Sequence, residues 1–145
     1  MTLIRPFSIF VVAAFALGVV SCDRGPSPVK GDQLNDFFPK NGDGHTILVT
    51  TEKDGFAQAS LKAAGVEVAT LAITDLIRDQ SAAAKFESAT EKVDGYPLLP
   101  RGNAGTAILV GRFQIQARSK DETFTETERR KWLSKCDLSG LSKLR

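Results

Sequence analysis

The fold is constrained most by two alternating segments that flank the dipeptide Gly111-Arg112. A two-residue loop that opens with glycine is typical of a type II′ hairpin turn, because glycine adopts the positive φ that this turn requires. In the register that the turn sets, four apolar side chains share one face, as the pairs Val110–Phe113 and Ile108–Ile115. The other face carries polar side chains: Gln114, Gln116 and Arg118. We therefore predict an antiparallel hairpin with one buried face and one wet face.

Upstream of the hairpin, three segments carry strand and helix patterns. Residues 45–51 are β-branched and apolar, and predict a buried strand. Residues 53–64 place apolar and small side chains at helical spacing, and Gly65 follows them as a helix C-cap. Residues 66–73 predict a second strand. A strand, a helix and a strand joined by short links imply a parallel pair with a right-handed crossover.

The rest of the chain predicts two more helices and a loop. One helix starts at Thr74 or Asp75 and continues to Lys92. Residues 94–105 hold two prolines among glycines and predict a loop. A last helix over 125–135 begins with the spacing of a capping box, Thr-Glu-Thr-Glu. It turns three side chains inward: Trp132, Leu133 and Cys136.

The predicted class is therefore α/β (or α+β), with the element order β-α-β-α-β-β-α. A parallel strand pair joins the antiparallel hairpin, and the helices pack on the sheet. This order resembles the thioredoxin-like fold. The redox motif of that family is two cysteines separated by two residues after the first strand, and residues 51–55 (TEKDG) stand in its place here. The resemblance thus implies the fold without the family's thiol–disulfide chemistry.

The N-terminus has the plan of a secretory signal, with Arg5 before an uncharged apolar run over residues 7–20. That run is shorter than the roughly 20 residues that a transmembrane helix needs. Residues 19–22 (VVSC) resemble the lipobox of bacterial lipoproteins, in which a small residue precedes the modified cysteine. The resemblance implies cleavage before Cys22 and acylation of its thiol. An uncleaved anchor and an ordinary signal peptide are the alternatives.

These patterns divide the chain into a signal peptide (1–21), a lipidated N-terminus with a flexible tether (22–44) and a single α/β domain (45–145). Within the tether, three apolar residues are spaced for one helical turn that docks on the domain: Leu34, Phe37 and Phe38. The expected location is the bacterial cell envelope. The lipid sits in a membrane and the domain faces the periplasm or the exterior.

Charge and composition argue against several classes of partner. The chain has 19 Lys and Arg against 17 Asp and Glu, without a long basic run, so we expect no nucleic-acid partner. One His and two Cys offer little for a metal site, and we expect neither a metal nor a cofactor. The expected partners are the membrane, through the lipid anchor, and an envelope protein.

The best candidate for a binding site is the loop before the hairpin. Tyr96, Arg101 and Asn103, together with Arg112 in the hairpin turn, are placed to border a site for a small ligand or a protein. Binding residues tend to lie on loops that a rigid scaffold holds. The alternative is that this loop serves only as a connection.

Three other features have a structural and a functional interpretation. Cys136 is either a small core residue or a nucleophile that a nearby cation activates. His45, the only histidine, lies in a solvated turn or acts as a base. The run over residues 129–131 (RRK) forms a solvated face paired with Glu126 and Glu128, or contacts anionic headgroups.

The sequence thus predicts a non-enzymatic envelope lipoprotein that binds a partner or assists an assembly at the membrane surface. One alternative is a small redox accessory or enzyme that uses Cys136 or His45. Another is a carrier of a small ligand beneath the loop 96–105.

Overall fold

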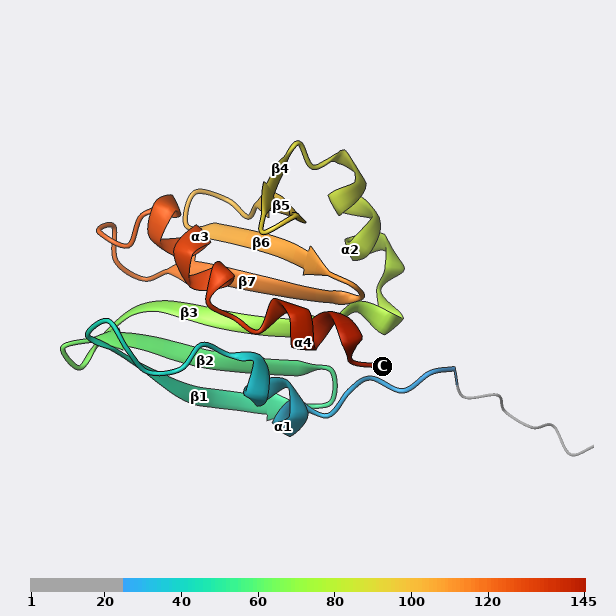
Figure 1. Cartoon of the computed structure of the whole chain (residues 1–145), viewed down its shortest axis with the longest axis horizontal. Helices are drawn as coiled ribbons and strands as arrows, with labels where there is room; N and C mark the ends of the chain where they lie inside the picture. Colours follow the sequence, from blue (N-terminus) through green and yellow to red (C-terminus); the bar gives the residue numbers. More distant parts are fainter. Residues whose placement is uncertain (1–24) are drawn as a thin grey trace, which may run out of the picture.

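A computed structural model describes residues 25–145, so the predicted signal peptide and Cys22 lie outside the described residues. Its main element is one seven-stranded sheet, ordered β1-β2-β3-β7-β6-β5-β4, in which all neighbouring strands are antiparallel (Figure 1). The strands are β1 (His45–Lys53), β2 (Phe56–Ala63), β3 (Val66–Asp75), β4 (Glu91–Val93), β5 (Tyr96–Pro100), β6 (Gly105–Val110) and β7 (Phe113–Ser119).

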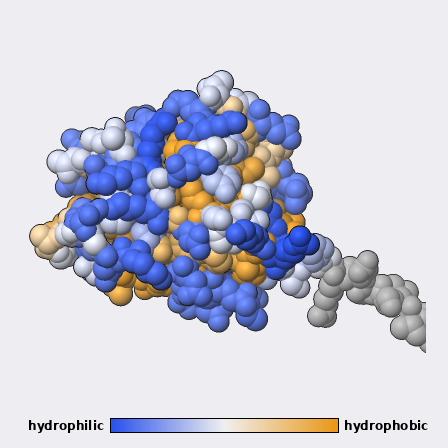
Figure 2. Space-filling view, viewed as in Figure 1, coloured by the Kyte–Doolittle hydropathy of each residue, from blue (hydrophilic) through white to orange (hydrophobic). Residues whose placement is uncertain are grey.

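The short helices lie in two groups. One face of the sheet is covered by α1 (Gly31–Leu34), η1 (Asn35–Phe37), α3 (Glu126–Ser134) and α4 (Leu138–Lys143) (Figure 1). The connection from β3 to β4 holds η2 (Leu76–Arg78), α2 (Gln80–Ala84) and η3 (Lys85–Ser88). The main core lies between the sheet and the first group, and its largest fully buried side chains include Trp132, Phe113, Leu34, Leu61 and Leu71. On the side carrying α3 and α4, hydrophobic residues reach the surface only in patches between hydrophilic ones (Figure 2).

The predicted α/β class with a parallel strand pair is wrong, because residues 56–63 form strand β2 instead of a helix. The dipeptides on either side of β2 are two-residue hairpin turns, Asp54-Gly55 and Ala64-Gly65. Ala64 has a φ of 48° and Gly65 a φ of 81°, as a type I′ turn requires. Gly65 is thus a turn residue and not a helix C-cap. With β2 as a strand, the crossover disappears and every strand pairs antiparallel with its neighbours.

The predicted helix to Lys92 and the predicted loop 94–105 are wrong for much of their length. The helical part consists of the short η2, α2 and η3, and β4 follows at Glu91. Asp94 and Gly95, both at positive φ, form a hairpin turn that leads into β5. Prolines exclude a helix but are accepted near a sheet edge, and Pro100 pairs only with Thr106 of β6.

Other expectations are confirmed. The hairpin of β6 and β7 pairs Val110 with Phe113 and Ile108 with Ile115, and all four side chains are buried. The helix predicted over 125–135 is α3, which is capped by Thr125, whose hydroxyl accepts a hydrogen bond from the Glu128 amide at 3.4 Å. Residues 45–51 do form a strand, but β1 is an edge strand with alternating half-buried and exposed residues instead of a buried one.

Residues 29–38, which we call the N-terminal strap, pack onto the same face as α3 and α4. Val29, Leu34 and Phe38 are buried, so the helical turn expected around Leu34 does dock on the domain. The backbone of Val29 bonds to the sheet twice: its carbonyl accepts from Gly55 N at 2.6 Å, and its amide donates to Asp75 Oδ2 at 2.9 Å. The strap thus fixes the start of the domain to the end of β3.

The helices of residues 25–145 are all too short or too polar to cross a membrane.

Candidate functional site

A pocket of about 520 Å³ lies where two loops meet the start of α3. The loop between β5 and β6 contributes two lining residues. The end of β7 and the loop that follows it contribute most of the others, and two residues of α3 complete the lining. Its lining residues are Asn103, Ala104, Ser119, Lys120, Asp121, Glu122, Phe124, Thr125, Glu126 and Arg129. Pockets of a few hundred Å³ are the size that small-molecule ligands occupy.

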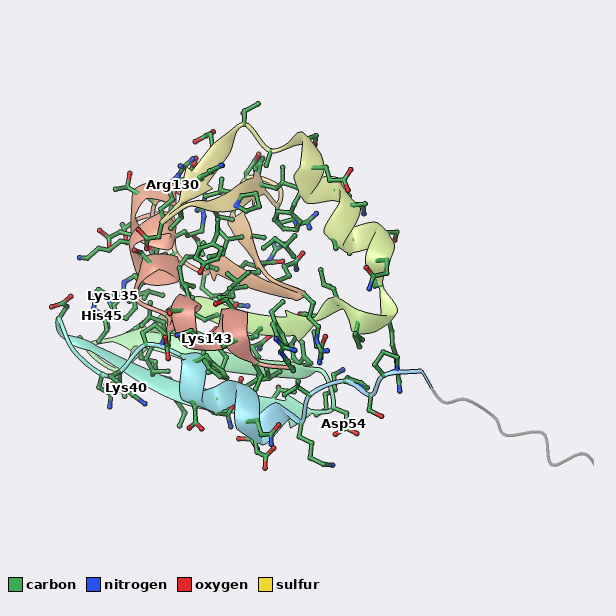
Figure 3. The ribbon with its side chains drawn as sticks, turned by 45° about the vertical axis from the view of Figure 1, so that its right-hand side comes forward. Lys40, His45, Asp54, Arg130, Lys135 and Lys143 are labelled. Atoms are coloured by element: carbon green, nitrogen blue, oxygen red, sulfur yellow. The ribbon has the colours of Figure 1, made fainter. Side chains whose placement is uncertain are left out.

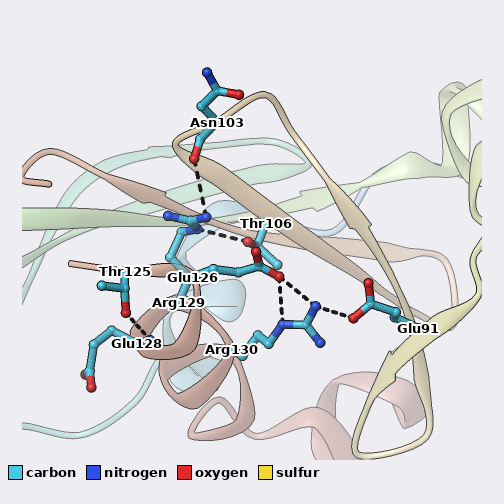
Figure 4. A network of polar contacts seen from close by, with 8 residues as sticks. All are labelled: Glu91, Asn103, Thr106, Thr125, Glu126, Glu128, Arg129 and Arg130. Atoms are coloured by element: carbon cyan, nitrogen blue, oxygen red, sulfur yellow. Dashed lines mark hydrogen bonds and ion pairs between the residues drawn. The ribbon is translucent and has the colours of Figure 1, made fainter. Parts of the chain in front are cut away.

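Arg129 is the buried charged group of this pocket, with only 6% of its surface exposed. Its Nε donates to Thr106 Oγ1 at 2.9 Å and its Nη2 to the Asn103 carbonyl at 3.5 Å (Figure 4). Its Nη1 donates to Ser119 Oγ at 2.8 Å. These three acceptors belong to β6, to the end of β7 and to the loop before β6. The guanidinium is therefore fixed by both loops that border the pocket.

All three acceptors are neutral, and no carboxylate within residues 25–145 forms an ion pair with Arg129. Glu126, one turn earlier on α3, is directed to Arg130 instead, at 2.6 Å from Nη2 and 3.0 Å from Nε (Figure 4). That hydrogen bond lowers the pKa of Glu126, with Arg129 contributing only the smallest effect. Asp121 accepts from the Thr123 hydroxyl and amide, each at 2.7 Å, and these bonds lower its pKa.

The predicted solvated face over residues 129–131 is thus only partly correct. Arg130 pairs with Glu126 across one helical turn and also with Glu91 of β4 (Figure 4), and Lys131 is exposed. Arg129 is the exception, because it points into the domain. Sequence reasoning missed it, although a signal existed: Arg129 stands three residues before Trp132 and four before Leu133, on the apolar stripe of the helix.

The four residues predicted to border a binding site do not come together. Asn103 lines the pocket, whereas Tyr96 is half-buried in β5 and packs against the core. Arg101 donates to Gln114 Oε1 at 2.7 Å and lies over the Phe86 ring. Arg112 pairs with the Asp75 carboxylate at 2.9 Å and supports the strap. Only one of the four is therefore part of the candidate site.

Cys136 is a core residue that follows the C-terminal end of α3. It is 5% exposed, and burial raises its pKa to about 12. Because the thiolate and not the thiol is the nucleophile, this cysteine is unreactive at neutral pH.

His45 lies at the beginning of β1, beside the buried Trp132. Its ring centroid is 5.0 Å from that of Trp132, and its Nδ1 is 2.7 Å from the Asp43 carbonyl. The Asp43 carboxylate also forms an ion pair with Lys135, the C-cap residue of α3. Figure 3 shows Lys135 beside His45. These contacts join the turn before β1 to the helix, and they account for His45 structurally.

Within the described part of the chain, no three His, Cys, Asp or Glu side chains are grouped to hold a metal ion. A second hollow, of about 510 Å³, is lined by residues of α2, η3, β5 and β6: Gln80, Ala83, Ala84, Phe86, Glu87, Pro97 and Leu109. It contains no buried cation. The pocket at α3 is therefore the stronger candidate for specific binding.

A scan against protein-family models, a search of curated proteins and a search of solved structures each found no match. Any function assigned to the chain therefore depends on the geometry of its own residues.

Proposed function

We propose that the chain is a lipid-anchored envelope protein whose domain binds a small ligand in the pocket at the start of α3. The observation that supports binding is the guanidinium of Arg129, which is buried in a pocket wall and has no carboxylate partner among residues 25–145. A ligand site needs apolar walls and a few polar groups held in fixed positions. Phe124 and Ala104 supply apolar wall, and Arg129 supplies a polar group that three hydrogen bonds fix.

The anchor is proposed from the signal-like N-terminus and the lipobox-like residues 19–22. Acyl chains on Cys22 would hold the protein at a membrane, because each buried methylene contributes about 0.8 kcal/mol. Cys22 is followed by only residues 23–28 before Val29, where the strap bonds to the sheet. A chain of that length spans at most about 25 Å. An anchor at Cys22 would therefore keep the domain close to the membrane surface.

A partner that adds a strand along the first half of β1 is disfavoured, because that part of the sheet edge is already occupied. The backbone of Gly42 exchanges hydrogen bonds with His45, at 3.1 Å and 2.9 Å. The Asn41 side chain accepts from Ile47 N at 2.7 Å. Such contacts protect an edge against pairing with another chain.

The redox alternative has lost its two supports. The thioredoxin-like element order is wrong, since the sheet contains no parallel pair in the described residues. The thiol of Cys136 is buried, and its pKa of about 12 keeps it protonated. A nucleophilic role for this residue is therefore not part of the proposal.

The test is a small-molecule library screened by thermal shift and by NMR against the full-length protein in detergent. In the variant Ala104→Leu, added carbons occupy the wall of the pocket, and binding of the compounds should be lost. The matched control is Ala84→Leu, which makes the same change in the second hollow and should leave binding unchanged. The proposal is wrong if no compound binds, or if bound compounds are insensitive to Ala104→Leu.

A further inference from the structure

We infer that the pocket at the start of α3 selects a small organic acid with a single carboxylate, which binds the guanidinium of Arg129. This inference rests on the proposed ligand-binding role of the pocket and adds the chemical class of the ligand. It follows from three features of the site: the unused donors of Arg129, the burial of its charge and the charges on the rim.

Arg129 has donors left over after its contacts in the domain. A guanidinium carries five N–H groups. One hydrogen bond forms at each of Nε, Nη1 and Nη2 of Arg129. One N–H therefore remains on each terminal nitrogen, and Arg129 lines the pocket. A carboxylate can accept two N–H groups of one guanidinium, as a phosphate also can.

The burial of Arg129 also favours an anionic ligand. A buried cation loses hydration, and neutral oxygens restore only part of that free energy. Asp75, the other buried charged residue among residues 25–145, has its charge balanced by an ion pair with Arg112. No carboxylate of the described chain balances the charge of Arg129. A carboxylate supplied by a ligand would balance it, and hydrogen bonds between charged groups are stronger in such a buried site than in water.

The rim of the pocket restricts the charge of that ligand. Beside Arg129 it carries one other cation, Lys120, and three acids: Asp121, Glu122 and Glu126. A sulfate or phosphate dianion would be repelled by these acids more strongly than a monoanion. The walls at Phe124 and Ala104 fit an apolar body attached to the carboxylate. A monocarboxylate with an apolar body matches both conditions.

The experiment compares acids with amides of the same shape. Benzoate is measured against benzamide, and hexanoate against hexanamide, with sulfate and phosphate as further probes, by NMR titration of the full-length protein at constant ionic strength. We expect each acid to bind at least ten times more tightly than its amide and than either inorganic anion. On titration with benzoate, the largest changes in the chemical shifts of backbone N–H groups should fall in residues 103–106 and 119–126.

Variants separate a ligand contact from a purely structural role of Arg129. Arg129→Lys keeps the charge but removes the planar pair of donors, and it should weaken benzoate binding at least tenfold. The matched control is Arg118→Lys, an exposed residue on the opposite face of the sheet, which should leave the affinity unchanged. If Arg129→Lys fails to fold, the acid–amide ratio of the unmodified protein and the loss of benzoate binding in Ala104→Leu decide the question.

The outcomes distinguish this inference from the proposed function. If acids and amides bind the pocket equally well, or if the inorganic dianions bind best, the inference is overturned while the pocket remains a ligand site. If benzoate binds a site that Ala104→Leu does not affect, the inference is overturned as well. If no compound of any class binds at the pocket, both fail.

Discussion

Two buried charges are stabilised in different ways in this domain. The Asp75 carboxylate is fully buried and accepts from Arg112, from Val29 N and from Ile77 N. Arg129 has hydrogen-bond acceptors but no carboxylate partner within residues 25–145. Asp75 thus has a structural role that its contacts explain fully, whereas the contacts of Arg129 leave donors for a ligand.

Replacement of Asp75 should destabilise the domain strongly. Asp75→Ala leaves the Arg112 guanidinium without its anion and frees the Val29 amide from the sheet. Removing one partner of a buried ion pair costs about 3 kcal/mol or more. We expect a loss of that size in the free energy of unfolding, measured by urea denaturation.

The control for this prediction is Asp36→Ala, which removes an exposed carboxylate from η1. An exposed substitution of this kind changes stability by about 0.5 kcal/mol at most. Equal effects of the two substitutions would contradict the structural role of Asp75.

The thiol of Cys136 should be protected from alkylation in the folded protein. Its pKa of about 12 leaves almost no thiolate at pH 8, and its side chain is buried. We expect iodoacetamide to modify the Cys136 peptide at least about a hundredfold more slowly in buffer than in 8 M urea, because the unfolded thiol ionises near pH 8.5. Mass spectrometry of the peptide measures both rates, and comparable rates would show that the thiol is accessible.

At the residue scale, the sequence indicates which side chains of α3 and of the segment just after it face inward, except for one. The stripe that contains Trp132, Leu133 and Cys136 is confirmed. The same stripe extends back to Arg129, but its charge and its basic neighbours suggested a solvated position. Burial of an arginine depends on acceptors from β6 and β7, which lie 23 and 10 residues away, respectively. Helical spacing alone does not identify such partners.

At the level of elements, the turn residues indicate the correct secondary structure of residues 56–63, whereas the spacing of their apolar side chains does not. Residues 56–64 fit a helical stripe, yet Ala57, Ala59 and Leu61 also alternate, and in β2 these three are the fully buried apolar side chains. The signal that distinguishes a strand from a helix here is the two-residue turn on either side of the segment. One of these turns is Asp-Gly, a dipeptide typical of hairpins. A short segment rich in alanine satisfies both periods, so only its flanking residues separate the two structures.

The contact between the strap and the β1–β2 hairpin predicts an intolerant glycine. A Cβ on Gly31 would lie 2.5 Å from Lys53 N and 2.8 Å from Phe56 O, which are backbone atoms. Gly31→Ala should therefore push α1 off the hairpin and cost about 2 kcal/mol, in the range of an overpacked core. Hydrogen exchange should become faster at Val29 and Gly55, where the strap bonds to the sheet.

Gly42→Ala is the matched control for Gly31→Ala, because nothing lies within 4 Å of a Cβ at that position. Its stability and its exchange rates should stay close to those of the unmodified protein. A strap that remains protected in Gly31→Ala would contradict the close packing described for α1.

At the scale of the whole molecule, local signals predicted the hairpin of β6 and β7 and the last helix, but not the sheet. The sheet depends on the pairing of β3 with β7, which joins Asp75 to Phe113 and Ala69 to Ser119. Nothing in either segment states the direction of that pairing. One misassigned element, residues 56–63, also turned two antiparallel hairpins into a predicted parallel strand pair and so changed the class of the fold.

The same pairing places the Val29 end of the strap and the pocket at opposite ends of β7. The strap bonds to Asp75, which pairs with the first residue of β7, and the pocket includes Ser119, the last residue of that strand. A seven-residue strand is about 20 Å long. If Cys22 is anchored in a membrane, the ligand site therefore lies at the end of the domain remote from the anchor.

The proposal that a lipid on Cys22 holds this domain at a membrane is tested most directly by intact-mass spectrometry combined with palmitate labelling of the protein from its own cells. We expect a chain that begins at Cys22 with the mass of added acyl groups, and radiolabel in the membrane fraction. The label should persist in Cys136→Ala, which removes the other cysteine, and disappear in Cys22→Ser. A protein that retains residues 1–21, or whose Cys22 carries no lipid, would contradict the proposed anchor.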